Sequence, residues 1–472
     1  MIRKNDEYIG VITDMGSEGE GVLKLDNLVV FLPFGLVGEK VRYKILKVSS
    51  KFAYGKILEV LTPAENRIRP KCAVFEKCGG CQLQHLRYQN QLKLKEENIE
   101  KCFSKIADLK VEVKPAVKSG LEFGYRNKLQ LPVGIVNGKT EIGFYAENSH
   151  RIIPIDDCPI NPDWTKTIIS CFKKYILDFN IVGYDEITHS GDLREITVKE
   201  IEGNLIITLV VLDKKPKGID SLIEILSSKL KGEFSLYINY NSKKSNVIYG
   251  NDFELVYGKP HYIAEAFGIK YKIGVRSFMQ VNNDVCLKLY STVRDLVDAD
   301  LHTTVVDAYS GAGLMTALLS VKAKNAYGIE IIEEAVKNAN ELALINGLSD
   351  KIVNYCGKCE DILPNLIKEE RAKGSKLCLV LDPPRKGCDL TVIDSIIKSG
   401  IEKIVYVSCK PSTLARDIGL LVGSLKCEDG QIRKVKDYTP RYELTCVKPF
   451  DMFPQTKHIE TVVCLTRKWN DF

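Results

Sequence analysis

The chain has 472 residues, of which 45% are hydrophobic and 27% charged, a composition that is ordinary for a globular protein. At roughly 100–200 residues per domain, this length allows about two to four domains. The net charge of +6 by itself identifies no partner. No apolar stretch approaches the roughly 18 residues of a membrane span, and the N-terminus lacks the apolar core of a secretory signal, so we expect a cytoplasmic protein without a membrane partner.

Residues 1–62 are predicted to form a small closed β-barrel. Five short segments alternate β-branched and polar residues and are separated by glycine-rich turns, and Pro63 makes a plausible boundary after the last of them. Small barrels of this kind often bind nucleic acid on one face, although a purely structural β-module is the alternative.

Residues 63–267 are expected to form an α+β domain with a largely antiparallel sheet. A charged helix is predicted over residues 86–106, and two further helices over about 163–179 and 221–230, among recurring strand-like runs. Residues 61–130 contain 14 Lys and Arg against 8 Asp and Glu, an excess equal to that of the whole chain. This basic region fits contact with nucleic-acid phosphates, and a solvated helix face remains the alternative.

Residues 268–472 alternate strand-like and helical segments, which predicts an α/β domain with a doubly wound, Rossmann-like parallel sheet. The segment 305–313 is a buried strand that runs into a glycine loop, where the backbone can approach a ligand closely. Glu330 ends the next strand, where a carboxylate can accept both hydroxyls of a ribose. Thr316 stands where a dinucleotide motif has its third glycine, and Asp382-Pro-Pro ends the fourth strand. These two features favour S-adenosylmethionine over a dinucleotide.

Cys409 stands apart from most of the 15 cysteines because it follows a predicted buried strand and precedes a helix expected to begin near Pro411. The adjacent Lys410 and the helix N-terminus are both expected to lower its thiol pKa. A thiolate there could attack carbon. Taken alone, a cysteine at a strand end is more often a small buried residue.

Five segments in order resemble the RNA (uracil-5-)-methyltransferase family. They are Ser277-Phe-Met-Gln280-Val-Asn282, Asp307-Ala-Tyr-Ser-Gly-Ala-Gly313, Asp382-Pro-Pro-Arg385, Tyr406-Val-Ser-Cys409-Lys-Pro411 and Met452-Phe-Pro-Gln-Thr-Lys-His458-Ile-Glu460-Thr461. The N-terminal half is similar to the iron–sulfur 23S ribosomal RNA branch of that family, which carries a TRAM-type barrel. The resemblance covers nearly the whole chain.

The resemblance implies that Cys409 forms a covalent bond to C6 of uracil, which makes C5 nucleophilic toward the methyl group of S-adenosylmethionine. Glu460 matches the position of the base that removes the C5 proton, and His458 ranks second. The implied contacts to S-adenosylmethionine fall on Gln280, Tyr309, Glu330 and Asp382. A polar contact that some relatives make after the second loop glycine is missing here, because Leu314 occupies that position, and Arg385 is expected to face the substrate.

Four other cysteines form a separate pattern, in which Cys72, Cys78 and Cys81 lie close together and Cys158 follows 77 residues after Cys81. Spacing alone leaves a structural zinc site and an iron–sulfur cluster open. The Cys-Gly-Gly-Cys-Gln-Leu-Gln-His stretch resembles the family's [4Fe–4S] site, which implies a cluster with a structural or RNA-positioning role. A further pair, Cys356 and Cys359, is expected to lie in a loop and to have no such role.

The expected partner is RNA, with the target uridine single-stranded or splayed out of a helix, and the protein is expected to be a monomer. Arg126 and Lys128 match a family stretch and could hold phosphates. Three alternatives stay open: methylation of the T-loop uridine of transfer RNA, a non-catalytic iron–sulfur or zinc protein that binds RNA, and a nicotinamide dehydrogenase.

Overall fold

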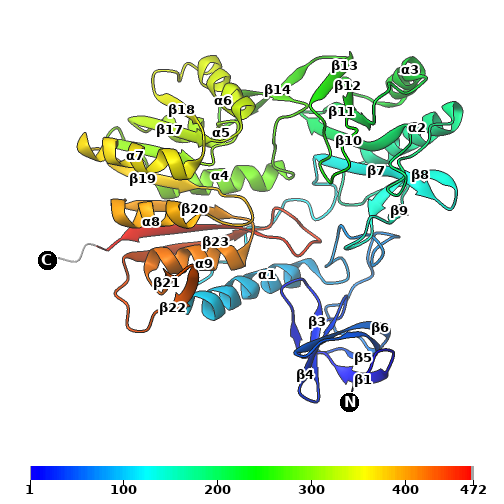
Figure 1. The fold of residues 1–472 in the computed structure, drawn as a ribbon, viewed down its shortest axis with the longest axis horizontal. Coiled ribbons are helices and arrows are strands. Elements are labelled where there is room, and N and C mark those ends of the chain that lie inside the picture. The colour runs from blue at the N-terminus through cyan, green and yellow to red at the C-terminus, as the bar shows by residue number, and fades with distance from the viewer. Residues whose placement is uncertain (1, 469–472) are drawn as a thin grey trace.

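The computed structural model describes residues 2–468. Three sheets organise the chain: an N-terminal barrel, a central sheet and a C-terminal sheet. Figure 1 shows them as three bodies, coloured blue, cyan to green, and yellow to red, with helix α1 lying beside the C-terminal sheet. None of the described helices combines the length and the apolar composition that a membrane span requires.

The N-terminal barrel has the strand order β1-β5-β6-β4-β3-β2. Alternate side chains of these strands point inward, and they form a core that includes Val30, Tyr43 and Ile45. The six strands are β1 (Glu7–Val11), β2 (Asp14–Met15), β3 (Gly21–Leu25), β4 (Leu28–Leu32), β5 (Lys40–Val48) and β6 (Phe52–Thr62). The expected β-rich, barrel-like N-terminal region is therefore present.

The central sheet has the order β13-β12-β11-β10-β7-β8-β9 and is antiparallel except for the pair β11–β12. Helices α2 (Trp164–Phe179) and α3 (Ile219–Lys229) bury their apolar faces in the core of this sheet. The strands are β7 (Lys128–Val136), β8 (Lys139–Tyr145), β9 (Ile152–Pro154), β10 (Leu193–Ile201), β11 (Asn204–Val211), β12 (Phe234–Tyr240) and β13 (Asp252–Tyr257), followed by the hairpin β14 (His261–Ala266) and β15 (Ile269–Gly274).

The C-terminal sheet has the order β18-β17-β16-β19-β20-β24-β23. Its first five strands are parallel, whereas β24 runs antiparallel to both of its neighbours. The strands are β16 (Thr303–Ala308), β17 (Asn325–Glu330), β18 (Ile352–Cys356), β19 (Lys376–Leu381), β20 (Lys403–Ser408), β23 (Tyr442–Phe450) and β24 (Glu460–Arg467), with a separate hairpin β21 (Leu425–Glu428) and β22 (Gln431–Lys434). The expected doubly wound α/β fold is confirmed.

Helices cover both faces of the C-terminal sheet, because a sheet of parallel strands is buried on both sides. They are α4 (Asn283–Val297), α5 (Leu314–Ser320), α6 (Glu333–Ile345), α7 (Cys359–Ala372), α8 (Leu390–Ser399) and α9 (Pro411–Val422). The start of α9 at Pro411 agrees with the sequence prediction. Cys356 ends β18 and Cys359 begins α7, so this pair does not lie in a loop as expected.

Helix α1 (Tyr88–Cys102) continues into one π-helical turn (Phe103–Ala107). Ile99, Phe103 and Ala107 are fully buried in the core of the C-terminal sheet, although the sequence analysis assigned this segment to the central domain. The helix thus connects the cysteine-rich segment before it with the C-terminal sheet.

Candidate active site

Cys409 and Glu460 lie at the same edge of the C-terminal sheet. Cys409 directly follows β20, and Glu460 begins β24. Ser408 pairs with Thr461 across these two strands, so the next step of the register brings Cys409 opposite Glu460. Cys409 is half-buried, whereas only 6% of the surface of Glu460 is exposed.

The environment of Cys409 differs from the one expected. Burial raises its thiol pKa to about 11, the carboxyl groups of Glu460 and Asp382 add to that rise, and Arg385 opposes it. The expected lowering of the thiol pKa by Lys410 and the start of α9 is therefore wrong as a net effect. Lys410 is exposed and contributes to the electrostatic environment of Glu18 in the N-terminal barrel. Arg385 is the cation that favours the thiolate.

The carboxyl group of Glu460 has a pKa well above its ordinary value, because burial and the nearby Asp382 disfavour its charged form. Arg385 acts in the opposite direction. A carboxyl group in such surroundings can take up a proton readily once it is ionised.

His458 lies two residues before Glu460, and its Nδ1 is 3.4 Å from Nη2 of Arg385. Burial, Arg385 and Lys457 lower the pKa of this imidazole to about 4, so it is neutral at pH 7. Arg385, which is expected from the sequence to face the substrate, lies near Cys409, His458 and Glu460.

Asp382 follows β19, one strand away from Cys409, and the pairing of Leu381 with Tyr406 aligns the ends of their two strands. Its side chain is accessible to solvent, yet the surrounding protein disfavours its charge and raises its pKa to about 7. Both properties are typical of a carboxyl group that lines a crevice. The negative charge of Asp382 contributes to the raised pKa values of Asp307, Cys409 and Glu460.

The glycine loop after β16 lies beside Asp382. Tyr309, Gly311 and Gly313 have φ angles of 70°, 54° and 82°, in the left-handed region that glycine adopts readily. Glu330 closes the loop by accepting a hydrogen bond of 3.0 Å from the N–H of Gly311. A Cβ atom at Gly311 would meet no heavy atom within 4 Å, so open space adjoins the loop at this point.

Tyr309 directs its side chain partly into the core. Burial and the neighbouring Cys388 and Cys359 raise the pKa of its phenol above the ordinary value. Cys359, which the sequence analysis assigned no function, therefore contributes to the environment of a predicted cofactor residue.

Gln280 lies on the segment that connects the central and C-terminal sheets. Asn127 supports this segment twice: its Nδ2 donates a 2.9 Å hydrogen bond to the carbonyl of Gln280, and its backbone N–H donates to Val281. The buried Lys199 donates a 2.6 Å bond to the carbonyl of Ser277. Neither Asn127 nor Lys199 is predicted from the sequence, and the one local signal is the position of Asn127 between Arg126 and Lys128.

The four cysteines of the second pattern line one cavity of about 200 Å³, which we call the four-cysteine cavity. Burial raises the thiol pKa values of Cys81 and Cys158 to about 12, and thiols of the same set add to each rise. Arg126 and Lys128 also line the cavity. Within residues 2–468, no group of three or more His, Cys, Asp or Glu side chains is placed so that it could hold a metal ion.

Two protein families match the chain. The family described as tRNA (Uracil-5-)-methyltransferase matches residues 87–468, and the TRAM domain matches residues 11–58. The RNA methyltransferase family that the sequence motifs predicted, and the TRAM-type barrel, are thus confirmed.

Two bacterial relatives extend over almost all of the chain. An uncharacterized RNA methyltransferase of Clostridium tetani is 39% identical over 468 residues, which cover 98% of this chain and 97% of the relative. One from Clostridium acetobutylicum is 38% identical over 474 residues and covers 99% and 98%.

A solved structure shares the fold. The tRNA (uracil-54, C5)-methyltransferase of Pyrococcus abyssi, in complex with S-adenosyl-L-homocysteine, is 24% identical to this chain with a TM-score of 0.75. The match covers 97% of this chain and 100% of that one. The chain therefore belongs to the tRNA (uracil-5-)-methyltransferase family of S-adenosylmethionine-dependent RNA methyltransferases and carries a TRAM domain near its N-terminus.

Proposed function

We propose that this protein methylates C5 of a uridine in 23S ribosomal RNA through a covalent bond between Sγ of Cys409 and C6 of the uracil. The observation that carries the proposal is the register between β20 and β24, which brings a thiol and a buried carboxyl group to one edge of the sheet. Asp382 and Arg385 adjoin both groups. This arrangement supplies a nucleophile, a base and a cation beside a ligand crevice.

The reaction begins when the Cys409 thiol loses its proton to solvent, with Arg385 stabilising the thiolate. The thiolate adds to C6, and the electron pair of the C5=C6 bond moves to C5 as part of an enolate. When bound, S-adenosylmethionine supplies the methyl group that C5 accepts. Glu460, in its ionised form, then takes the proton from C5, the C5=C6 bond re-forms, and the C6–S bond breaks to return the thiolate.

Gln280, Tyr309, Glu330 and Asp382 are the residues that would hold S-adenosylmethionine. The open space beside Gly311 and the carboxylate of Glu330 suit the ribose at the end of β17. Asp382 supplies a second carboxyl group at the neighbouring strand end, next to Cys409. The donor set therefore fits the ligand that the family uses.

Cys72, Cys78, Cys81 and Cys158 would hold a [4Fe–4S] cluster. Four thiols around one cavity suit a cluster, in which each cysteine binds a different iron. Methyl transfer needs no electron, so a cluster here would act on structure or on RNA placement.

RNA would be bound by the barrel of residues 1–62 and by the central domain of residues 63–267, and the chemistry would lie in residues 268–472. A uracil must leave its stack before a thiolate can reach C6. The four-cysteine segment, which resembles the 23S branch, supports ribosomal RNA. The barrel does not separate ribosomal from transfer RNA, because the Pyrococcus enzyme has the same fold across 97% of this chain.

The test is to incubate the purified protein with S-adenosylmethionine and either unmodified 23S RNA or unmodified transfer RNA, and to map 5-methyluridine in each. We expect methylation of 23S RNA. Methylation of transfer RNA alone would overturn the ribosomal assignment, and methylation of neither would overturn the enzymatic one. Gel filtration of the active protein is expected to show a monomer.

A further inference from the structure

The loop of residues 451–459 connects β23 to β24 and ends at Glu460. It has nine residues, whereas most hairpin loops have about two to five. Phe450 and Glu460 form the last pair between β23 and β24, so the loop begins directly after Phe450 and ends directly before Glu460. The path of this loop therefore determines where Glu460 is placed.

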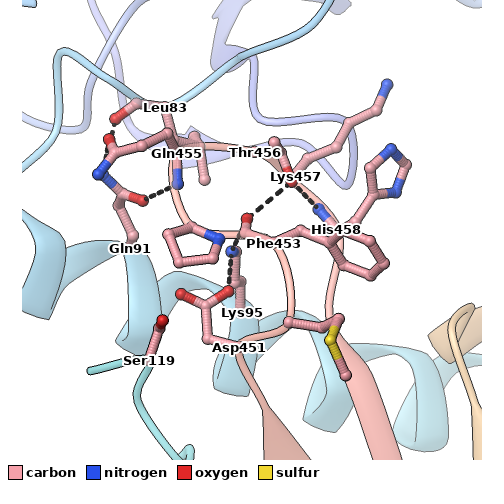
Figure 2. A network of polar contacts seen from close by, with 12 residues as sticks. Leu83, Gln91, Lys95, Ser119, Asp451, Phe453, Gln455, Thr456, Lys457 and His458 are labelled. Carbon is pink, nitrogen blue, oxygen red and sulfur yellow. Dashed lines mark hydrogen bonds and ion pairs between the residues drawn. The ribbon is translucent and has the colours of Figure 1, made fainter. Parts of the chain in front are cut away.

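Helix α1 holds the loop through a reciprocal pair of glutamines. Oε1 of Gln91 accepts a 3.0 Å hydrogen bond from the backbone N–H of Gln455, and Nε2 of Gln91 lies 3.0 Å from Oε1 of Gln455. The same nitrogen also lies 3.0 Å and 2.8 Å from the carbonyl oxygens of Leu83 and Leu86. Together with Oε1 of Gln455 these make three acceptors, and the two hydrogens of the amide can bond two of them at once. Figure 2 shows Gln91 reaching from α1 to Gln455. Gln91 is fully buried.

Gln455 needs such support because its φ angle is 71°, a conformation that residues other than glycine seldom adopt. Its carbonyl accepts hydrogen bonds from the N–H groups of Gln82 and Leu83, which directly follow Cys81. The centre of the loop is thus held by α1 and by the segment between the cysteines and α1, and Gln455 Nε2 and the carbonyl of Pro454 make further bonds to Glu122 and Tyr125.

One turn further along α1, Lys95 holds the beginning of the loop. Its Nζ lies 2.6 Å from Oδ1 of Asp451 and 3.2 Å from the carbonyl of Phe453, and both charged side chains are buried (Figure 2). Gln91 and Lys95 are four residues apart, so they lie on the same face of the helix. That face covers the loop.

Glu460 has no comparable anchor of its own. Within residues 2–468, no group donates a hydrogen bond to its carboxylate, and its electrostatic neighbours are Asp382 and Arg385. The position of its side chain is therefore set by the backbone of β24 and by the loop that leads into it. A shift in the loop would move the carboxylate relative to Cys409.

We propose that Gln91 is a positioning residue for the release step: by fixing Gln455 it sets the loop 451–459 and, through it, Glu460. This inference rests on the proposed role of Glu460 as the base. Gln91 does not touch the reacting atoms, and Cys409 lies on a different strand, so loss of Gln91 impairs proton removal and leaves addition of the thiolate unchanged.

The test compares Gln91→Met, which removes the amide at similar volume, with Gln89→Met on the exposed side of the same helix. With ordinary RNA, we expect Gln91→Met to lower turnover by about 100-fold and to accumulate the covalent protein–RNA adduct. With RNA containing 5-fluorouridine, the methylated adduct has fluorine in place of the C5 proton. Fluorine cannot leave as a cation, so the covalent adduct is trapped whether or not a base is present. We therefore expect Gln91→Met to trap the fluorinated RNA at the rate of the unsubstituted protein.

The variant Ile99→Ala shows how a general destabilisation of α1 affects trapping and turnover. Ile99 is buried on α1 in the core of the C-terminal sheet and makes no polar contact with the loop, so its truncation destabilises the helix and should slow trapping and turnover alike. Should Gln91→Met fail to fold, Gln91→Asn retains the amide on a shorter side chain, and we expect it also to accumulate the adduct. A Gln91 variant that behaves like Gln89→Met, or that loses trapping in proportion to turnover, would overturn the inference.

The variant Glu460→Gln separates this inference from the proposed function. If it accumulates adduct and the Gln91 variants do not, only the positioning role fails. If it releases methylated RNA at the normal rate, Glu460 is not the base and both ideas fail. We also expect the double variant Gln91→Met/Glu460→Gln to turn over as slowly as Glu460→Gln alone, because the two substitutions impair the same step.

Discussion

Ser408 pairs with Thr461 across the antiparallel ladder between β20 and β24, and this pairing brings Cys409 opposite Glu460. Strands β16 to β20 of the C-terminal sheet are parallel, and their carboxyl ends meet at one edge. Because β24 runs the opposite way, it contributes its first residue to that edge. A nucleophile at the end of one strand thus meets a carboxyl group at the beginning of another.

The first prediction concerns the division of roles between these two residues. Cys409→Ala is expected to abolish both methylation and the covalent adduct, because it removes the proposed nucleophile. Glu460→Gln keeps the shape of the side chain but cannot accept the C5 proton, so the adduct should accumulate. Denaturing gels with radiolabelled RNA measure the adduct, and nucleoside analysis measures 5-methyluridine.

Cys446→Ala serves as the control, since this half-buried cysteine lies in β23 of the same sheet. It should leave both measurements near those of the unsubstituted protein. Rapid release of methylated RNA by Glu460→Gln would identify another group as the base.

The second prediction concerns the cation that favours the thiolate. Arg385 lowers the thiol pKa of Cys409, which burial and Glu460 raise to about 11. Arg385→Met should therefore raise that pKa further, and a rise of one unit reduces the thiolate fraction about tenfold below the pKa. Alkylation of Cys409 by iodoacetamide at pH 8 should slow accordingly, as peptide mass spectrometry can measure.

Lys410→Met is the matched control, because Lys410 is adjacent in sequence but its side chain is exposed. We expect its alkylation profile to stay within about twofold of the unsubstituted protein. A large effect of Lys410→Met together with none of Arg385→Met would restore the interpretation drawn from the sequence.

The fold of the C-terminal half could be predicted because its strands and helices carry clear periodic signals. The strand before Cys409 and the helix start at Pro411 were both predicted from local sequence. Helix α4 was missed, although Val285, Leu289, Val293 and Val297 recur at every fourth position and mark its buried face.

The electrostatics of the candidate site could not be predicted from neighbours in sequence. Lys410 is adjacent to Cys409 but is not among the main groups that set its thiol pKa, whereas Arg385 lowers that pKa from beyond the end of another strand. Likewise, nothing local indicates that Gln91 meets Gln455, since only folding brings together two residues so far apart in the chain. Charge–charge effects depend on distance and burial, which sequence order does not give.

The third prediction concerns the four-cysteine cavity. Cys158→Ser should abolish cluster binding, because a serine oxygen is a poor ligand for iron in such clusters. Protein purified without oxygen should contain iron and sulfide and absorb visible light, and the variant should lose these properties. Cys171→Ser, in helix α2 and outside the cavity, is the control and should keep them. One zinc per chain and no sulfide in the unsubstituted protein would contradict the cluster.

The fourth prediction concerns the attachment of the barrel to the segment that follows it. Glu39 is fully buried, and its carboxylate accepts hydrogen bonds from Leu36, Ala64 and Arg67, including one of 2.8 Å to Nη2 of Arg67. Burial by itself would raise the pKa of Glu39, but these hydrogen bonds outweigh it and hold the pKa below its ordinary value. Arg67→Met removes the charged partner and should destabilise the barrel by about 3–5 kcal/mol at pH 7.

The pH dependence of that loss has a definite sign. With Arg67 present, the pKa of Glu39 is lower in the folded state, so its stabilisation is full above the unfolded pKa and declines as pH falls. Without Arg67, burial raises the folded pKa, and the buried carboxyl group becomes less unfavourable once it is protonated. The destabilisation by Arg67→Met should therefore be smaller at pH 4.5 than at pH 7. Hydrogen exchange in β5, corrected for the intrinsic rate, measures it. Arg42→Met breaks two exposed ion pairs in the same barrel, to Glu7 and Glu59, and should cost no more than about 1 kcal/mol at either pH. Equal losses from the two arginine variants would show that the burial of Glu39 has no energetic consequence.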